Sequence, residues 1–115
     1  MIKRRKPEKT GIRKPSQLRS PAHLQWVRGH TCAIDADGCE GKVEAAHVRI
    51  GTDGGMGVKP SDNYAIPLCH WHHAQQHNLG ERSFEALHRI SMLQIAEDLA
   101  RRSPALVRNA IAEDV

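Results

Sequence analysis

The sequence predicts a small α+β domain with a single core, and three observations support this fold class. The chain has 115 residues, the usual size of one domain. Two short strand patterns, 42–50 and 64–68, flank a glycine-rich loop, and helical patterns occupy most of the remaining length. Only four residues are aromatic, which is few for a core of this size, and a bound metal ion would help to stabilise it.

The elements follow from local signals along the chain. Ser20 and Pro21 suit an N-cap followed by a proline at the first helical position, and Gly29 suits a helix end, which predicts a helix over 21–28. We then expect a loop at 32–39, a strand at 42–50, a long functional loop at 51–62, a strand at 64–68 and a helix at 71–77. Three C-terminal helices are expected at 82–88, at 92–102 and from 104 onward.

These elements predict a disordered basic arm at 1–19 and one domain at 20–115. The core of the domain would span about 30–80, and its C-terminal helices about 81–115. Trp71 is expected to pack in the core. His23, His30 and His88 are interpreted as ordinary surface or core residues.

Charge is distributed very unevenly along the chain. The net charge is +4, but residues 1–20 alone carry +7, because they hold one acid and eight bases. The remaining residues hold nine bases and twelve acids, which gives −3. Lysines and arginines in such an arm release counterions when they meet phosphates, so the arm favours contact with nucleic acid, the alternative being a solubilising tail. The eight bases are Lys3, Arg4, Arg5, Lys6, Lys9, Arg13, Lys14 and Arg19.

The three cysteines cannot all pair within the chain as disulfides. An odd count without a secretory signal favours thiolates that bind metal in a reducing cytoplasm. Cys69 and His72 have the Cys-x-x-His spacing of half a zinc site, and Cys32 and Cys39 complete a set of four sulfur and nitrogen ligands. Such a set suits a closed, tetrahedral, structural Zn²⁺. His73 is the competing choice for the fourth ligand.

A second pair of histidines follows directly. His73 and His77 are four residues apart, so they share one face of the predicted helix and could supply half of a second, more open metal site. In the first strand, Val43, Ala45, His47 and Arg49 share one face.

The chain resembles the HNH endonucleases, which have the ββα-metal fold. The resemblance covers roughly residues 20–90 and lies in three ordered motifs: Glu44-Ala45-Ala46-His47-Val48-Arg49, the loop from Gly55 to Asn63, and Pro67-Leu68-Cys69-His70-Trp71-His72-His73 through His77. Within that group the chain is most similar to phage and prophage nucleases of the Ref type, which depend on a recombinase. The resemblance implies a metal-dependent DNA endonuclease with a zinc-stabilised ββα-metal core flanked by helices.

The resemblance also implies roles for individual residues. His47, whose imidazole titrates near neutral pH, would be the general base. Asn63 would orient it, with Asp62 as the competing choice. A divalent cation (Mg²⁺, Mn²⁺ or Zn²⁺) on His73 and His77 would bind the scissile phosphate. Arg49 completes the catalytic set on the strength of its position: it lies two residues after His47 on the same strand face and could contact the phosphate, the alternative being an ordinary residue of the strand surface. Lys59 and the loop at 51–62 would cradle the DNA backbone together with the arm at 1–19.

One position departs from the family pattern. Ala46 stands where the family usually has a metal-binding histidine or aspartate, so that water, phosphate or Glu44 would have to complete the second site. The alternative function is therefore a catalytically degenerate zinc module that binds DNA as a recombination accessory. A third is an RNA-directed or protein-interaction module. A cytoplasmic location in a bacterial host, a recombinase filament as a partner and the absence of membrane contact are further expectations.

Overall fold

A computed structural model describes residues 17–55 and 57–106 of the chain. Two antiparallel strands and the helices around them make this an α+β fold, as predicted. No helix in these ranges is long and apolar enough to cross a membrane. The elements in chain order are α1 (Pro21–Arg28), β1 (Val43–His47), β2 (Ala65–Cys69), α2 (His70–Leu79), α3 (Glu81–His88) and α4 (Met92–Arg102).

The sheet consists of β1 and β2 alone, paired so that Val43 lies opposite Cys69 and His47 opposite Ala65. β1 is shorter than the predicted strand at 42–50. The backbone N–H groups of Arg49 and Ile50 donate to the Glu81 carboxylate instead of continuing the ladder. Strand pairing therefore stops before Arg49 and Ile50, whose N–H groups bind the first residue of α3.

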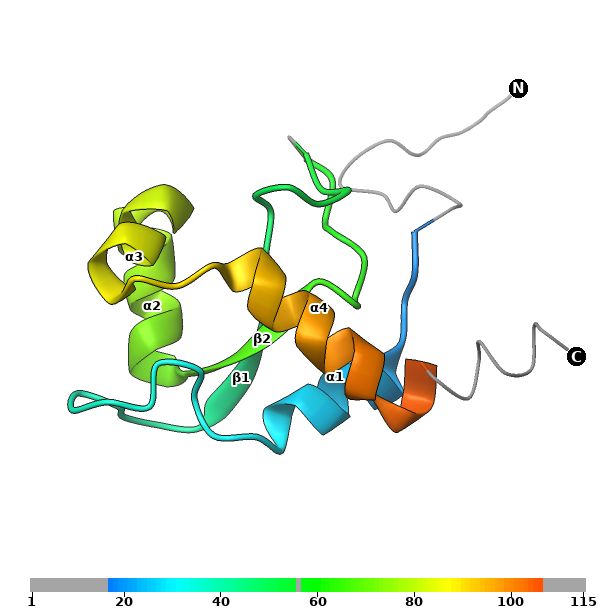
Figure 1. Cartoon of the computed structure of the whole chain (residues 1–115), viewed down its shortest axis with the longest axis horizontal. Helices are drawn as coiled ribbons and strands as arrows, with labels where there is room; N and C mark the ends of the chain where they lie inside the picture. Colours follow the sequence, from blue (N-terminus) through cyan, green and yellow to red (C-terminus); the bar gives the residue numbers. More distant parts are fainter. Residues whose placement is uncertain (1–16, 56, 107–115) are drawn as a thin grey trace, which may run out of the picture.

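The hydrophobic core lies between the sheet and the helices. Figure 1 shows α4 crossing the sheet, with α2 and α3 side by side at one end of it and α1 near the other. All five residues of β2 are buried, which fits a strand covered on both faces. The core residues include Ala46, Val48, Ile66, Leu68, Phe84, Met92 and Ala96.

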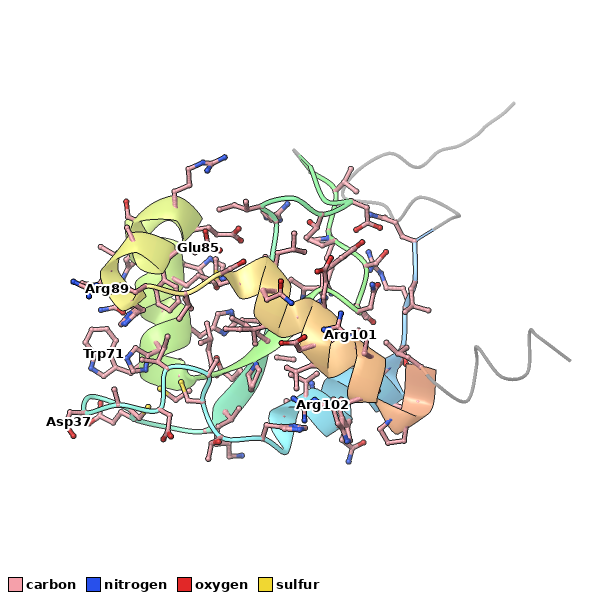
Figure 2. All side chains as sticks on the ribbon, viewed as in Figure 1. Asp37, Trp71, Glu85, Arg89, Arg101 and Arg102 are labelled. Carbon is pink, nitrogen blue, oxygen red and sulfur yellow. The ribbon has the colours of Figure 1, made fainter. Side chains whose placement is uncertain are left out.

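Helices α1 and α4 have the predicted bounds because their caps are local. The side chains of Ser20 and Ser91 accept hydrogen bonds from the third residue of each helix. Helical backbone resumes at Pro104 as expected, and residues 107–115 lie outside the described ranges. The prediction that Trp71 packs in the core was wrong. Its side chain is 43% exposed and lies at the periphery of the molecule, as Figure 2 shows.

Residues 17–20 form what we call the N-terminal strap, and they correct the predicted boundary of the arm. Gln17 is buried and donates to the carbonyls of Asp53 and Lys59. The backbone N–H of Leu18 donates to the Ser61 hydroxyl, and the N–H of Asp62 donates to the Leu18 carbonyl. The strap is thus part of the folded domain, whereas residues 1–16 of the predicted arm lie outside the described ranges.

Candidate functional sites

The first site is a cluster of three thiols and one imidazole at the start of α2. Cys69 is both the last residue of β2 and the N-cap of α2, and its Sγ accepts a hydrogen bond from the backbone N–H of His72. The Cys-x-x-His spacing therefore places His72 one turn into the helix, beside Cys69. Cys32 approaches from the loop whose Ala33 N–H donates to the Pro67 carbonyl of β2.

The four ligand atoms lie close enough together to bind one metal ion. They all lie within 4.8 Å of one another. The Nδ1 atom of His72 is 3.6 Å from the Sγ of Cys32, 3.6 Å from that of Cys39 and 3.3 Å from that of Cys69. A tetrahedral zinc ion with bonds of about 2.3 Å to sulfur and about 2.0 Å to nitrogen would set these S···N edges at about 3.5 Å. The cluster can hold a structural metal ion, and its donor set suits Zn²⁺.

The electrostatics of two of these ligands, His72 and Cys69, also suit a metal. Burial, reinforced by His88, lowers the pKa of His72, which keeps the imidazole in the neutral form that binds metals. Burial tends to raise the pKa of Cys69, but backbone N–H groups from His72 and Glu40 reverse this and leave the pKa below its usual value. A thiolate and a neutral imidazole are the protonation states that a zinc ligand requires.

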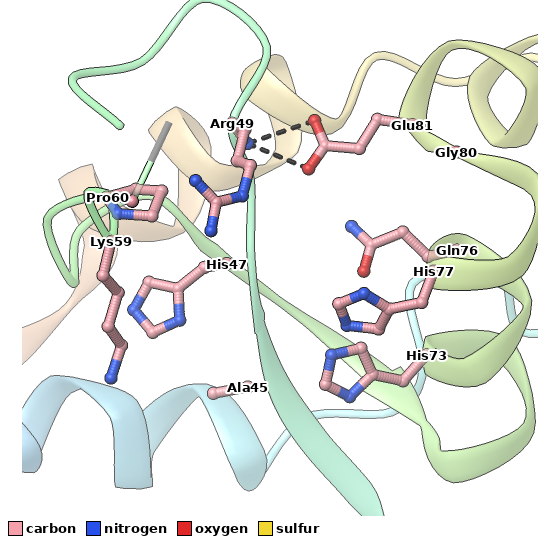
Figure 3. A pocket seen from close by; sticks show the side chains of 11 residues that line it. Ala45, His47, Arg49, Lys59, Pro60, His73, Gln76, His77, Gly80 and Glu81 are labelled. Atoms are coloured by element: carbon pink, nitrogen blue, oxygen red, sulfur yellow. Dashed lines mark hydrogen bonds between the residues drawn. The ribbon is translucent and has the colours of Figure 1, made fainter. Parts of the chain in front are cut away.

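The second site is a cavity of about 570 Å³ between β1, the loop at 51–62 and α2. Figure 3 shows His47 on one side of this cavity and His73 with His77 on the other. Arg49 and Lys59 also line it, and so does Glu81, whose carboxylate is engaged by the backbone N–H groups of Arg49 and Ile50. The wall is therefore rich in histidine and cationic side chains.

His47 is hydrogen-bonded to a buried carboxylate. Its Nε2 atom lies 2.9 Å from Oδ1 of Asp62, whose residue is 3% exposed, and Oδ2 of Asp62 accepts the N–H of Ser20 at 2.7 Å. Because a carboxylate accepts, Nε2 carries the proton of the neutral ring and Nδ1 keeps its lone pair. Burial lowers the pKa of His47; Asp62 opposes this, while Lys59 and Arg19 reinforce it. The ring is consequently neutral at neutral pH.

The orienting partner of His47 is thus Asp62, the competing choice in the sequence analysis. Asn63 is the next residue along the chain and is half-buried. The side chain that reaches Nε2 belongs to Asp62 because the strap holds this residue: Ser20 binds its carboxylate and Leu18 accepts its N–H. The role assigned to Asn63 therefore stays a prediction that this geometry does not support.

On the opposite wall, Glu44 orients His73. Oε1 of Glu44 accepts a hydrogen bond from Nδ1 of His73 at 2.7 Å, and Oε2 lies 3.0 Å from Nδ1 of His70. Both hydrogen bonds lower the pKa of Glu44, and the bond from His73 has the larger effect. The Nε2 lone pair of His73 is left for another partner. The rings of His73 and His77 lie with centroids 5.0 Å apart, as expected for residues one turn apart.

Ala46 belongs to the core rather than to this cavity. It is fully buried in the hydrophobic cluster, whereas its neighbours Ala45 and His47 line the cavity wall. A larger side chain introduced at position 46 would therefore enter the core rather than the cavity. The strand position that lines the cavity beside His47 is Ala45.

Arg49 anchors the loop at 51–62. Its NH1 group donates to the carbonyls of Gly55 at 2.9 Å and Val58 at 3.1 Å, two residues that pair with each other through both backbone groups. Of the four residues predicted to share one face, Ala45, His47 and Arg49 line the cavity, whereas Val43 is not part of its lining. The guanidinium lies between this loop and the cavity.

Sequence reasoning missed two residues that contact groups of the cavity wall, Arg19 and Glu44. Arg19 was counted only as a charge of the arm, and Glu44 only as a substitute metal ligand. Glu44 could have been found, because it pairs with Leu68 near the end of β2, and the first turn of α2 begins two residues later. Arg19 left no such signal, because it meets the loop some 40 residues later in the chain.

Comparison with known proteins identifies the family. A family model described as "Protein of unknown function (DUF968)" matches residues 5–103, which is most of the chain. The chain belongs to the DUF968 family. No curated protein and no solved structure matches this DUF968 chain. The matched range includes both the cysteine cluster and the cavity of the DUF968 domain.

Proposed function

We propose that this DUF968 protein is a metal-dependent DNA endonuclease of the HNH type, with His47 as the general base. The observation that carries the proposal is the hydrogen bond between His47 and the buried Asp62 in the wall of a cavity that also holds Lys59 and the histidines of α2. A neutral, carboxylate-oriented imidazole facing a cationic cavity suits hydrolysis of a phosphodiester.

The base would act through Nδ1. With the Nε2 proton held on Asp62, the Nδ1 lone pair of His47 can take a proton from water as the water attacks phosphorus. Asp62 would then stabilise the imidazolium that forms, as a buried carboxylate does beside a catalytic histidine. Lys59 and Arg49, which line the cavity, would offset the negative charge of the phosphate.

His73 and His77 would hold the catalytic cation. They supply two imidazoles on one face of α2, and the contact with Glu44 leaves Nε2 of His73 as its donor atom. This fits a cation that takes its remaining ligands from water and phosphate oxygens. When bound, such a cation stabilises negative charge on the phosphate and on the leaving oxygen. Glu44 would fix the tautomer of His73 from outside the coordination shell.

DNA is the substrate that the charge distribution favours. Residues 1–20 carry +7, and the strap attaches the end of that segment to the loop that lines the cavity. A strand held by the arm would be delivered to the side of the cavity that carries Lys59. Hydrolysis there would leave 5′-phosphate and 3′-hydroxyl ends, as the resemblance to HNH enzymes implies.

The alternative is a DNA-binding zinc module without catalysis. One observation favours it. Within the described residues, the side chains that lie close enough together to bind a metal ion as a group of three or more are Cys32, Cys39, Cys69 and His72. This group does not include His73 or His77. The cavity would then serve only to bind phosphate.

A nicking assay distinguishes the two functions. Supercoiled and single-stranded DNA would be incubated with Mg²⁺, Mn²⁺ or no added metal, using wild type, His47→Ala and the matched control His30→Ala. His30 lies beyond α1 and does not line the cavity. We expect wild type and His30→Ala to cut and His47→Ala to lose at least about 10²-fold in rate. Equal background in all three, with DNA binding retained, would leave the non-catalytic module.

A further inference from the structure

Arg19 joins the strap to the pair formed by His47 and Asp62. Its NH1 group donates to the Pro60 carbonyl at 2.6 Å, and its NH2 group donates to the Lys59 carbonyl at 3.0 Å. NH1 also lies 3.5 Å from Oδ1 of Asp62, the same oxygen that accepts the His47 hydrogen bond. One guanidinium therefore contacts both the backbone that carries Asp62 and the carboxylate that orients the base.

This arrangement uses the shape of arginine. A planar guanidinium can donate from two nitrogens in fixed directions, whereas lysine has only one ammonium nitrogen. The Arg19 side chain is 22% exposed and the Asp62 side chain 4%, so the ion pair is only partly screened by water. Two further contacts, from Ser20 and Leu18, hold Asp62 from the same strap.

We propose that Arg19 is a positioning residue of the His47 base, which fixes the loop that carries Asp62 and shares the Asp62 carboxylate with His47. The proposal rests on the proposed function for its catalytic meaning, but the contacts themselves do not depend on it. It extends the site from the strand and α2 to a segment that precedes α1 in the chain.

The electrostatic consequence has a definite sign. Against the lowering effect of burial, the Asp62 carboxylate raises the pKa of His47. Arg19 offsets that charge, and together with Lys59 it lowers the pKa of His47 in the same direction as burial does. The other charged or titratable groups around His47 are Arg49 on the strand that continues from it, His73 and His77 on α2, Glu81 on α3 and the buried His23 on α1.

The test is an NMR titration of the His47 imidazole in the full-length, zinc-loaded protein. The resonance that disappears in His47→Gln identifies the residue. Wild type would be compared with Arg19→Gln, Arg19→Lys and Arg28→Gln, the last being a control that removes the same charge from an exposed position on α1. We expect the pKa of His47 to rise in Arg19→Gln and to stay near its wild-type value in Arg28→Gln. If the protein cuts DNA, the acid limb of the pH–rate profile of Arg19→Gln should move to higher pH together with the pKa of His47.

Arg19→Lys separates charge from shape. Its retained charge should keep the pKa of His47 near the wild-type value, while loss of the two-pronged contact should speed amide exchange at Asp62, whose N–H donates to the Leu18 carbonyl. If Arg19→Gln fails to fold, the Arg19→Lys variant still tests the proposal. An Arg19→Gln protein that folds with an unchanged His47 pKa, or an Arg19→Lys protein with unchanged amide exchange, would overturn the proposal. Absence of DNA cleavage by wild type would refute the nuclease function. The NMR titration would still decide whether Arg19 positions His47 and Asp62.

Discussion

The Nε2 atom of His47 lies 2.9 Å from Oδ1 of Asp62, and this bond joins the end of the first strand to the end of the long loop. Asp62 is 3% exposed and is also held by the N–H of Ser20. A carboxylate so placed has no freedom to turn away from the imidazole. The relation therefore fixes both the tautomer and the direction of the ring, which is what a general base requires.

Replacing Asp62 with asparagine tests this relation. The amide can still accept from Nε2, but it lacks the charge that stabilises the imidazolium, so we expect cleavage to slow by about 10²-fold. Because Asp62 raises the pKa of His47, its removal should move the acid limb of the pH–rate profile to lower pH. Steady-state cleavage across pH 5–9 measures both effects.

Asn63→Ala is the matched control, since it alters the adjacent, half-buried residue. It should retain most of the activity. A large loss in Asn63→Ala combined with a fully active Asp62→Asn would return the orienting role to Asn63.

How much of this site the sequence could predict depends on how local each part is. The bounds of α1 and α4 follow from serine caps that lie within four residues of the groups they bind, and both were predicted correctly. The cysteine cluster was also recognisable, because few residue sets bind zinc and Cys-x-x-His at a helix start places two ligands together. The end of β1 was not predictable, because it depends on the Glu81 carboxylate, more than 30 residues away. The choice between Asp62 and Asn63 likewise depends on a strap more than 40 residues earlier.

Zinc analysis should find about one tightly bound ion per chain. The triple change of Cys32, Cys39 and Cys69 to serine should abolish it and destabilise the fold, because binding energy at such a site is folding energy. His72→Cys should retain zinc, since a four-thiolate set is also tetrahedral. Metal content by mass spectrometry and thermal unfolding with and without chelator provide the readouts. Full zinc retention by the triple variant would contradict the assignment, and His73→Ala should keep its zinc as a control.

Glu44→Gln should weaken cation binding in the cavity without disturbing the structural zinc. The glutamine oxygen carries no full negative charge, so it holds the His73 ring less firmly and orients Nε2 less well toward a cation. We expect Mn²⁺ affinity, measured by calorimetry on zinc-loaded protein, to fall by about 10- to 100-fold. His70→Ala removes the other partner of Glu44 from a position that does not line the cavity, and it should have little effect. Equal losses in both variants would show that the exposed contact between Glu44 and His70, and not the orientation of His73, determines the cation affinity.

His23 should make stability depend on pH. It is fully buried, its Nδ1 lies 2.7 Å from the Ser103 hydroxyl, and its Nε2 has no hydrogen-bond partner within the described structure. Burial lowers its pKa from 6.5, against the opposing charge of Asp62, so the unfolded chain takes up a proton more readily than the folded one. Stability from His23 is thus complete above about pH 6.5 and declines as pH falls toward the folded-state pKa, by at most about 1.4 kcal/mol per pH unit.

His23→Asn isolates this contribution, because an amide can keep the contact with Ser103 but does not titrate. Urea unfolding of the variant and wild type between pH 5 and 8 should show a shallower slope in the variant, whatever its absolute stability. His47 and His72 also have lowered pKa values, but they are common to both proteins and cancel in the comparison. Parallel curves would exclude His23 as a source of the pH dependence.

Two N-terminal deletions should separate DNA binding from the chemistry of the cavity. Removing residues 1–16 takes away seven of the basic residues but leaves the strap, so DNA affinity should fall while the pKa of His47 stays unchanged. If each of the seven met one phosphate, the slope of log affinity against log salt would become less negative by at most about 6. Removing residues 1–19 also deletes Gln17, Leu18 and Arg19, which hold the loop. We therefore expect the longer deletion to raise the pKa of His47 as well, and identical behaviour of the two deletions would mean that the strap contributes nothing to the base.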